Sequence, residues 1–255
     1  MKEPPRLDII GSQVTAAPFD VLMEVILAWA KRRQSKCICV ANTHMLVEAY
    51  QRPSFKKVMQ KADMVTPDGM PLVWMLKLMG AKKQNRVAGL DLMRALCQRA
   101  AEQNISVYFL GSMAPILQRM RKRLLTEFPN LLIADMEPLP FRPLTSAEDR
   151  HLIQRINNSG AGVVMIALGC PKQESWMANH KEKINAVMIG LGGAFPVYAG
   201  IHRRAPSWVR AMGLEWFYRL IQEPRRLWKR YVSSIPLFVY LALKQICYRC
   251  WSALF

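Results

Sequence analysis

The sequence has no run of about 20 predominantly apolar residues, the length that a helix needs to span a bilayer. Its first residues lack the apolar stretch of a signal peptide. Six cysteines are present, but most lie in or beside apolar runs, and the Cys247/Cys250 pair has no second Cys or His pair to complete a zinc site. These absences argue against a disulfide framework and favour a protein of the reducing cytoplasm.

Common nucleotide-binding signatures are also missing. There is no G-x-x-x-x-G-K-[ST] phosphate loop, and Gly190-Leu191-Gly192-Gly193 does not match G-x-G-x-x-G. A P-loop enzyme or a Rossmann dehydrogenase is therefore poorly supported. The sequence has no D-x-D motif for a metal either; we interpret its nearest approach, Asp135-Met136-Glu137, as the end of a strand.

Acidic residues are few: 18 Asp and Glu stand against 36 Lys and Arg, for a net charge of +18. The excess is densest in residues 201–255, which hold ten basic residues and two Glu. Such a charge favours polyanionic partners, namely nucleic acid, anionic lipid or phosphorylated small molecules.

Short apolar runs alternate with longer helical patterns over the first 200 residues. Predicted strands cover residues 7–11, 37–41, 62–66, 106–110, 131–134, 162–168 and 186–191. Predicted helices cover residues 19–33, 70–80, 89–103, 113–128, 145–158 and 171–183. This alternation predicts an α/β fold, a Rossmann-like and mainly parallel sheet with helices on both faces.

After about residue 200 the pattern changes to short, basic helical pieces that contain tryptophan. Pro224 should restart a helix there, and residues 231–243 carry no charge. We therefore expect an α/β domain over residues 1–200 and a C-terminal basic, amphipathic helical appendage over residues 201–255. The appendage has the composition of a segment that docks on a membrane surface.

Polar and glycine residues follow several of the predicted strands, at the edge where parallel sheets bind their ligands. Asp68 follows one such strand, in Thr66-Pro67-Asp68-Gly69. An Asp-Gly pair is by itself typical of a turn or a helix cap. At this edge, however, the Asp68 carboxylate can also take a proton from an attacking hydroxyl group.

Residues 169–174 open a helix directly after a buried strand. Free backbone N–H groups at such a helix start can hold a phosphate, and Lys172 and Gln173 add side-chain donors. An ordinary strand–helix connection explains the segment equally well.

Two further strand ends offer ligand contacts. Gly192 and Gly193 permit close approach of the backbone to a ligand. Asn42 and Thr43 offer hydrogen bonds to a sugar, although such a pair is as often a helix cap. We expect the neighbouring His44 to be structural, since no metal-ligating partner accompanies it.

The basic residues of the appendage allow two interpretations. They can form a solvated, lipid-facing surface, or some can fold over the pocket and neutralise a diphosphate, whose oxygens match the planar fork of arginine. Arg219, Arg226 and Lys229 would share one helix face if helical geometry continued between them, and Arg230 is adjacent.

In this order, the segments resemble the WecG/TagA/CpsF glycosyltransferases, also called glycosyltransferase family 26, over residues 7–231. The motifs that carry the resemblance are Val40-Ala41-Asn42-Thr43-His44, Pro67-Asp68-Gly69, Arg86-Val87-Ala88-Gly89-Leu90-Asp91, Gly169-Cys170-Pro171-Lys172-Gln173-Glu174, Gly192-Gly193-Ala194-Phe195, Arg203-Arg204-Ala205-Pro206 and Gly213-Leu214-Glu215-Trp216.

The resemblance implies an activity that the composition does not. Family members move a sugar, of N-acetylmannosamine type or glucose, from a UDP-sugar to an undecaprenyl-diphosphate-linked acceptor in cell-surface polysaccharide synthesis. Transfer inverts the anomeric centre and uses no metal or other cofactor. The resemblance also implies association with the inner face of the cytoplasmic membrane, and a homo-oligomer.

The resemblance assigns roles to individual residues of this chain. Asp68 corresponds to the catalytic base. The substrate-binding positions correspond to Thr43, Arg86 and Gln173, and the diphosphate-binding positions to Arg219, Arg226 and Lys229. Lys229 stands where an arginine is expected, with Arg230 beside it. Without a D-x-D motif, these cationic side chains must supply the countercharge to UDP.

Two other classes of protein fit part of the pattern. A nucleic-acid-binding α/β protein explains the net charge equally well. A nucleotide-dependent oxidoreductase is a second alternative, and it predicts that the protein binds NAD. The ordered motifs favour the glycosyltransferase and a lipid-linked acceptor over a nucleic-acid partner.

Overall fold

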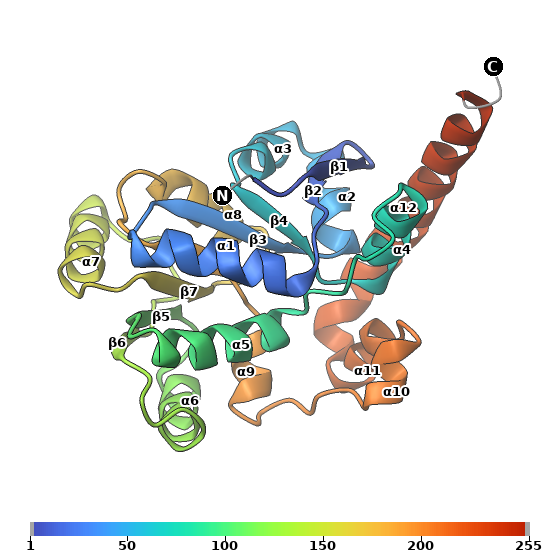
Figure 1. The fold of residues 1–255 in the computed structure, drawn as a ribbon. Helices are drawn as coiled ribbons and strands as arrows, with labels where there is room; N and C mark the ends of the chain where they lie inside the picture. Colours follow the sequence, from blue (N-terminus) through green and yellow to red (C-terminus); the bar gives the residue numbers. More distant parts are fainter. Residues whose placement is uncertain (1–2, 253–255) are drawn as a thin grey trace.

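The computed structural model describes residues 3–252, apart from the side chains of Cys250 and Ser252. Its centre is a six-stranded parallel sheet with the order β4-β3-β8-β7-β5-β6 (Figure 1). The strands are β3 (Lys36–Ala41), β4 (Met64–Pro67), β5 (Val107–Gly111), β6 (Ile133–Glu137), β7 (Val163–Ala167) and β8 (Val187–Gly190). These strands match the predicted runs to within a few residues, and the predicted α/β fold is confirmed.

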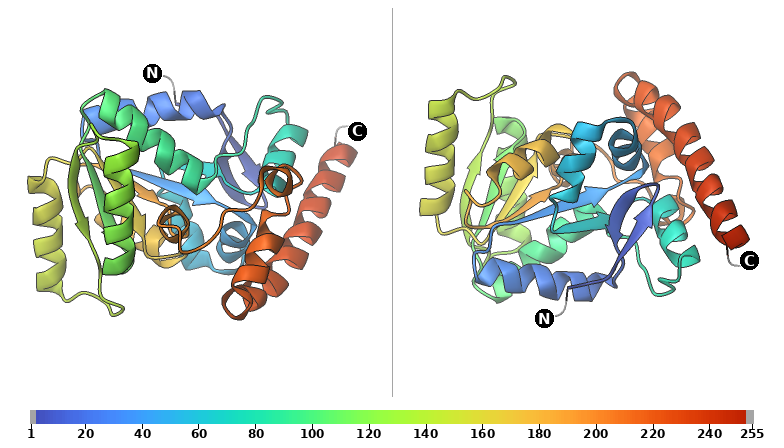
Figure 2. Two further views of the ribbon diagram at one scale, coloured as in Figure 1. Left: turned by 90° about the horizontal axis from the view of Figure 1, so that it is seen from below. Right: turned by 90° about the horizontal axis from the view of Figure 1, so that it is seen from above.

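Alternate strand residues point to opposite faces of the sheet and form two separate cores. Ile38, Phe109 and Ile189 belong to one core, whereas Cys39 and Met188 belong to the other. The first core is covered by α1 (Phe19–Lys31), α5 (Gly89–Glu102), α6 (Ala114–Glu127) and α9 (Ala194–Tyr198). The second is covered by α2 (Thr43–Gln51), α3 (Pro53–Gln60), α4 (Met70–Leu78), α7 (Ser146–Asn158) and α8 (Lys172–His180). Figure 2 shows helices on both sides of the sheet.

The N-terminal strand does not join this sheet. β1 (Arg6–Ile9) pairs antiparallel with β2 (Ser12–Thr15) in a separate two-stranded sheet. Ile10 and Gly11 form the turn and both have positive φ, 44° and 81°, so the chain reverses after only four strand residues. The prediction that residues 7–11 form a strand of the parallel sheet is therefore wrong.

The appendage contains α10 (Ser207–Ala211), α11 (Glu215–Gln222) and α12 (Pro224–Ser252). A helix restarts at Pro224, as predicted, but it continues for 29 residues in place of the short pieces expected. Pro236 lies inside α12, where buried Phe238 and Leu241 hold the helix against the domain. Tertiary packing therefore offsets the helix-breaking tendency of this proline. Within residues 3–252, no helix is both long and apolar enough to cross a bilayer.

The end of α12 is tied to the N-terminal hairpin. The Gln245 side chain donates a hydrogen bond to the Asp8 carbonyl at 2.8 Å and accepts one from the Ile10 N–H at 2.9 Å. α12 also packs on α2, and it lies beside α4 in both figures (Figures 1 and 2). The appendage is thus held against the sheet edge at which β3 and β4 end.

Candidate active site

A cavity of about 590 Å³ lies at the C-terminal ends of the parallel strands, the edge at which the sequence predicts ligands. Residues that follow β3, β4, β7 and β8 line one side of it. The appendage lines the other. Of the predicted site residues, the cavity brings together Asn42, Asp68, Arg86, Gln173, Gly192, Gly193, Arg219, Arg226 and Arg230.

Asp68 lies directly after β4, and its position is fixed by the backbone. Its N–H donates to the Ala41 carbonyl at 2.7 Å, and its own carbonyl accepts from Arg86 Nε at 2.5 Å. These contacts hold the carboxyl group at the cavity wall, where burial raises its pKa. The nearby Arg86 guanidinium opposes this shift of the Asp68 pKa, whereas the Glu215 carboxylate adds to it.

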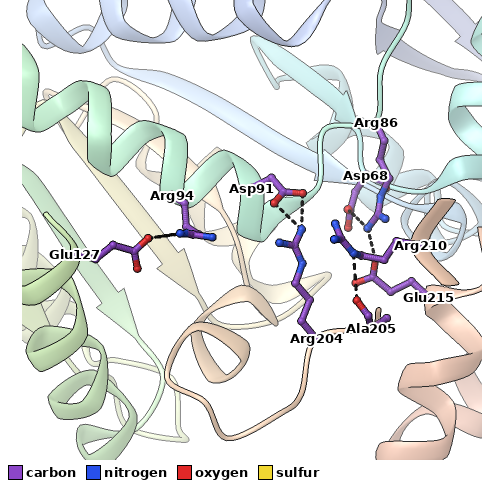
Figure 3. A network of polar contacts seen from close by, with 9 residues as sticks. All are labelled: Asp68, Arg86, Asp91, Arg94, Glu127, Arg204, Ala205, Arg210 and Glu215. Carbon is purple, nitrogen blue, oxygen red and sulfur yellow. Dashed lines mark hydrogen bonds and ion pairs between the residues drawn. The ribbon is translucent and has the colours of Figure 1, made fainter. Parts of the chain in front are cut away.

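Arg86 joins two carboxylates that come from different parts of the molecule (Figure 3). Its Nη2 atom lies 3.4 Å from Asp68 Oδ1 and 2.6 Å from Glu215 Oε2. Because Glu215 begins α11, this ion pair attaches the appendage to the base candidate itself. Sequence reasoning gave Glu215 no role, although it lies in the Gly213-Leu214-Glu215-Trp216 motif that was singled out.

Two arginines of the appendage project over the strand ends. Arg219 Nη2 lies so close to Gly193 that a Cβ atom there would be 2.7 Å away and would displace the guanidinium. Arg230 comes from α12, and within the described residues its buried Nε atom has no hydrogen-bond partner. Burial lowers the pKa of Arg230, and the charges of Arg219 and Arg226 lower it further. An anion placed here would relieve that cost.

Arg226 lines the cavity and pairs with Glu223 at 2.8 Å, whereas Lys229 does not line it. Lys229 is exposed and lies over the Trp228 ring. The shared helix face expected for these residues does not form, because helical geometry breaks at Glu223, between α11 and α12. Arg230 takes the place at the cavity that the sequence pattern gave to Lys229.

Gln173 is buried at the start of α8, and its side chain is engaged within the protein. It accepts a hydrogen bond from the Gly169 N–H at 3.2 Å and donates one to Glu174 Oε1 at 2.8 Å. A Cβ at Gly190 would lie 2.7 Å from its amide nitrogen, so glycine is required there. Gln173 thus shapes the cavity wall, whereas Lys172 is exposed and lines no cavity described here.

The segment that follows β3 both caps helix α2 and lines a cavity. Asn42 caps α2 by accepting a hydrogen bond from the Met45 N–H at 3.2 Å, which confirms the capping interpretation. Thr43 and His44 line a second cavity next to the first. Burial, with the charges of Arg230 and Arg52, lowers the pKa of His44 to about 4, so this imidazole is neutral near pH 7.

The second cavity has a volume of about 380 Å³ and lies between α4 and α12. The two cavities meet at a polar junction. The residues that line both are Asn42, Asp68, Arg86, Glu215, Arg219, Leu227 and Arg230. The base candidate and three arginines therefore lie between the two cavities.

A second ion pair holds the segment that leads to the appendage. Arg204 Nη2 lies 2.5 and 2.6 Å from the two carboxylate oxygens of Asp91, in the first turn of α5 (Figure 3). Arg210 Nε donates to the Ala205 carbonyl at 3.1 Å and fixes the turn into α10. In residues 3–252, no group of three His, Cys, Asp or Glu side chains is placed to hold a metal ion. The side chain of Cys250 lies outside the described residues, so the Cys247/Cys250 pair remains a sequence interpretation.

Comparison with known proteins identifies the family of the chain. The model of the Glycosyl transferase WecG/TagA/CpsF family matches residues 7–250. An N-acetylglucosaminyldiphosphoundecaprenol N-acetyl-beta-D-mannosaminyltransferase of Bacillus spizizenii is 32% identical over 240 residues, which cover 94% of this chain and 89% of the relative. The Bacillus subtilis protein of the same name is 32% identical over 210 residues, covering 82% and 79%. The chain therefore belongs to the WecG/TagA/CpsF family and is a glycosyltransferase.

Proposed function

We propose that this protein transfers an N-acetylmannosamine-type sugar from a UDP-sugar to an undecaprenyl-diphosphate-linked acceptor, with inversion and without a metal ion. The observation that carries this proposal is the position of Asp68, at the junction of two cavities and beside appendage arginines. The names of the two Bacillus relatives support the choice of sugar and acceptor. Glucose is the alternative donor sugar.

The proposed chemistry is a single in-line displacement. An acceptor hydroxyl attacks C1 of the donor sugar, its proton passes to Asp68, and the bond from C1 to the UDP oxygen breaks. The raised pKa of Asp68 matches a base that must hold the proton it receives. Arg219 and Arg226 stabilise the negative charge that develops on the leaving diphosphate.

We further propose that the protein works at the cytoplasmic membrane surface. Exposed apolar side chains lie along α12, among them Val232, Tyr240 and Tyr248. Together with the basic residues of the appendage, they suit an interface between water and anionic lipid.

A transfer assay with several UDP-sugars, read by mass spectrometry, tests the reaction. UDP-N-acetylmannosamine should give product with a short lipid-diphosphate acceptor, in the presence of EDTA as well as in its absence. Asp68→Asn should keep UDP binding and lower kcat by about 10²–10⁴-fold. Near-normal turnover by this variant would remove Asp68 as the base. Thermal stabilisation by NAD or an oligonucleotide, but not by UDP, would contradict the proposal as a whole.

A further inference from the structure

The groove between α4 and α12 has walls that differ in chemistry from those of the main cavity. Apart from the junction, its lining is almost entirely apolar. The apolar residues on its walls are Met70, Pro71, Trp74, Met75, Leu78, Trp216, Ile235, Phe238, Val239, Ala242, Leu243 and Ile246. We call this space the α4–α12 groove.

The groove has a polar end and an apolar end. At the inner end are Asp68, Arg219 and the unpartnered Nε atom of Arg230. Toward the other end are Leu78 and Leu243, whose exposed fractions are 68% and 56%. Large exposed apolar side chains are costly in water and mark contact surfaces. The groove thus runs from the base candidate to an apolar rim.

We propose that the α4–α12 groove binds the isoprenoid chain of the acceptor, in the part next to its diphosphate. This inference rests on the proposed function and deepens it. The groups of a sugar–diphosphate–prenyl molecule match the groove in order. Its sugar hydroxyl matches Asp68, its negatively charged diphosphate matches Arg230, and its hydrocarbon chain matches the apolar walls. With its sugar hydroxyl at Asp68, the diphosphate lies at Arg230 and the prenyl units enter the groove.

The lining favours a hydrocarbon chain over a peptide or a second protein copy. A bound peptide segment would bring backbone N–H and C=O groups that must be hydrogen-bonded, and the groove walls offer few polar partners away from the junction. A prenyl chain has no such groups. Its burial against Trp74, Phe238 and Ile246 removes apolar surface from water on both sides.

The position of the rim explains how one molecule can occupy both the site and a membrane. α12 continues past the body of the protein (Figure 1), and its exposed side chains beyond the groove include the aromatic residues Tyr248 and Trp251 together with Arg249. The prenyl units beyond the groove therefore leave along a surface that combines aromatic and basic side chains, as expected at a lipid interface. The groove selects the lipid end of the acceptor, while the main cavity remains available for the nucleotide sugar.

The first test compares two acceptors in membrane-free solution, an N-acetylglucosaminyl diphosphate that carries either a methyl or a farnesyl group. We expect the wild-type KM for the farnesyl acceptor to be at least about tenfold lower. Equal KM values would overturn the groove proposal but leave the proposed function intact. No transfer to either acceptor would contradict the proposed function itself, and the third test still decides the groove.

The second test uses a matched pair of valines on α12. Val239 lines the groove, whereas Val232 is also exposed, at 66% against 49% for Val239, but does not line it. Val239→Asn should raise the KM ratio of farnesyl to methyl acceptor about tenfold, and Val232→Asn should leave that ratio unchanged. An equal change in both variants, or in neither, would contradict a prenyl-binding groove.

The third test does not depend on activity. A farnesyl diphosphate that carries a benzophenone group is photo-crosslinked to the full chain, and the modified peptides are mapped by mass spectrometry. Crosslinks should fall on α4 and on residues 235–246 of α12, and unlabelled farnesyl diphosphate should compete with them. Crosslinks that map elsewhere, or none above an alkyl-free benzophenone control, would overturn the proposal.

Discussion

The central strands of the α/β domain are buried on both faces, whereas α11 of the appendage contains no fully buried residue. α12 buries a few side chains, such as Leu227 and Phe238, and leaves much of its length exposed. Yet the appendage supplies Glu215, Arg219 and Arg230 to the site. The two regions thus differ in what they supply: the domain holds Asp68 in place, and the appendage adds charged side chains around it.

Removal of the appendage should have the largest effect on activity, because it takes away the charged side chains that α11 and α12 supply to the site. Truncation after Gly213 removes the arginines and one wall of the α4–α12 groove. We expect transfer below the detection limit and loss of retention on vesicles, with a domain that still unfolds cooperatively because one core stays whole and the other loses only its α12 residues, Phe238, Leu241 and Ala242. Circular dichroism and vesicle sedimentation measure these outcomes. Normal transfer by the truncated protein would show that the appendage is not part of the site.

Removal of a single charged side chain of the appendage should have the next largest effect on activity. Arg219→Ala should lower kcat/KM by about 10²–10³-fold, because the diphosphate loses a donor at the cavity. Arg225→Ala is the matched control, since Arg225 is exposed and lines neither cavity. Steady-state kinetics with both variants distinguishes a local contact from a general surface charge. Similar losses in the two would favour the surface interpretation.

Glu215→Gln tests whether the two regions are coupled electrostatically. The Glu215 carboxylate raises the pKa of Asp68, so its removal should lower that pKa. A base works only when deprotonated, and the acidic limb of the pH profile of kcat/KM should therefore move to lower pH. An unchanged acidic limb, with intact UDP binding, would mean that Glu215 serves only to attach α11.

A substitution in the domain, away from the site, should lower stability and leave activity nearly unchanged. Asp63 lies before β4, accepts the Cys37 N–H at 2.9 Å and pairs with Lys36 and Lys181. Asp63→Asn should cost about 1–3 kcal/mol of unfolding free energy and leave kcat nearly unchanged. These hydrogen bonds lower the pKa of Asp63, so its contribution is present above the unfolded-state pKa and is lost as pH falls through the lowered value. Denaturant unfolding at two pH values measures this loss.

Much of the domain could be predicted from sequence because its signals are local. Buried strands appear as continuous apolar runs, and Asp68 follows one of them. The first strand was misplaced because a short apolar run does not state its partner; the turn at Ile10 and Gly11 decides that. Helices α2 and α3 were not predicted at all.

The parts of the site that sequence could not reveal depend on distant contacts. Glu215 meets Arg86 across 129 positions of the chain, and no spacing rule predicts that pair. Lys229 was expected at the site because it would share a helix face with Arg219 and Arg226 in one continuous helix. The helix breaks at Glu223, so this shared face does not form. Packing against α2 and α11 sets where α12 lies, and this places Arg230 at the cavity.

The bond between Gln245 and the N-terminal hairpin has a consequence for synthesis of the protein. It joins residues 235 and 237 positions apart, at Ile10 and Asp8. The domain can fold as it leaves the ribosome, but α12 reaches its place only after residue 245 has emerged. This helix thus completes the pocket after the domain has been made, and we expect a nascent chain without it to have no transfer activity.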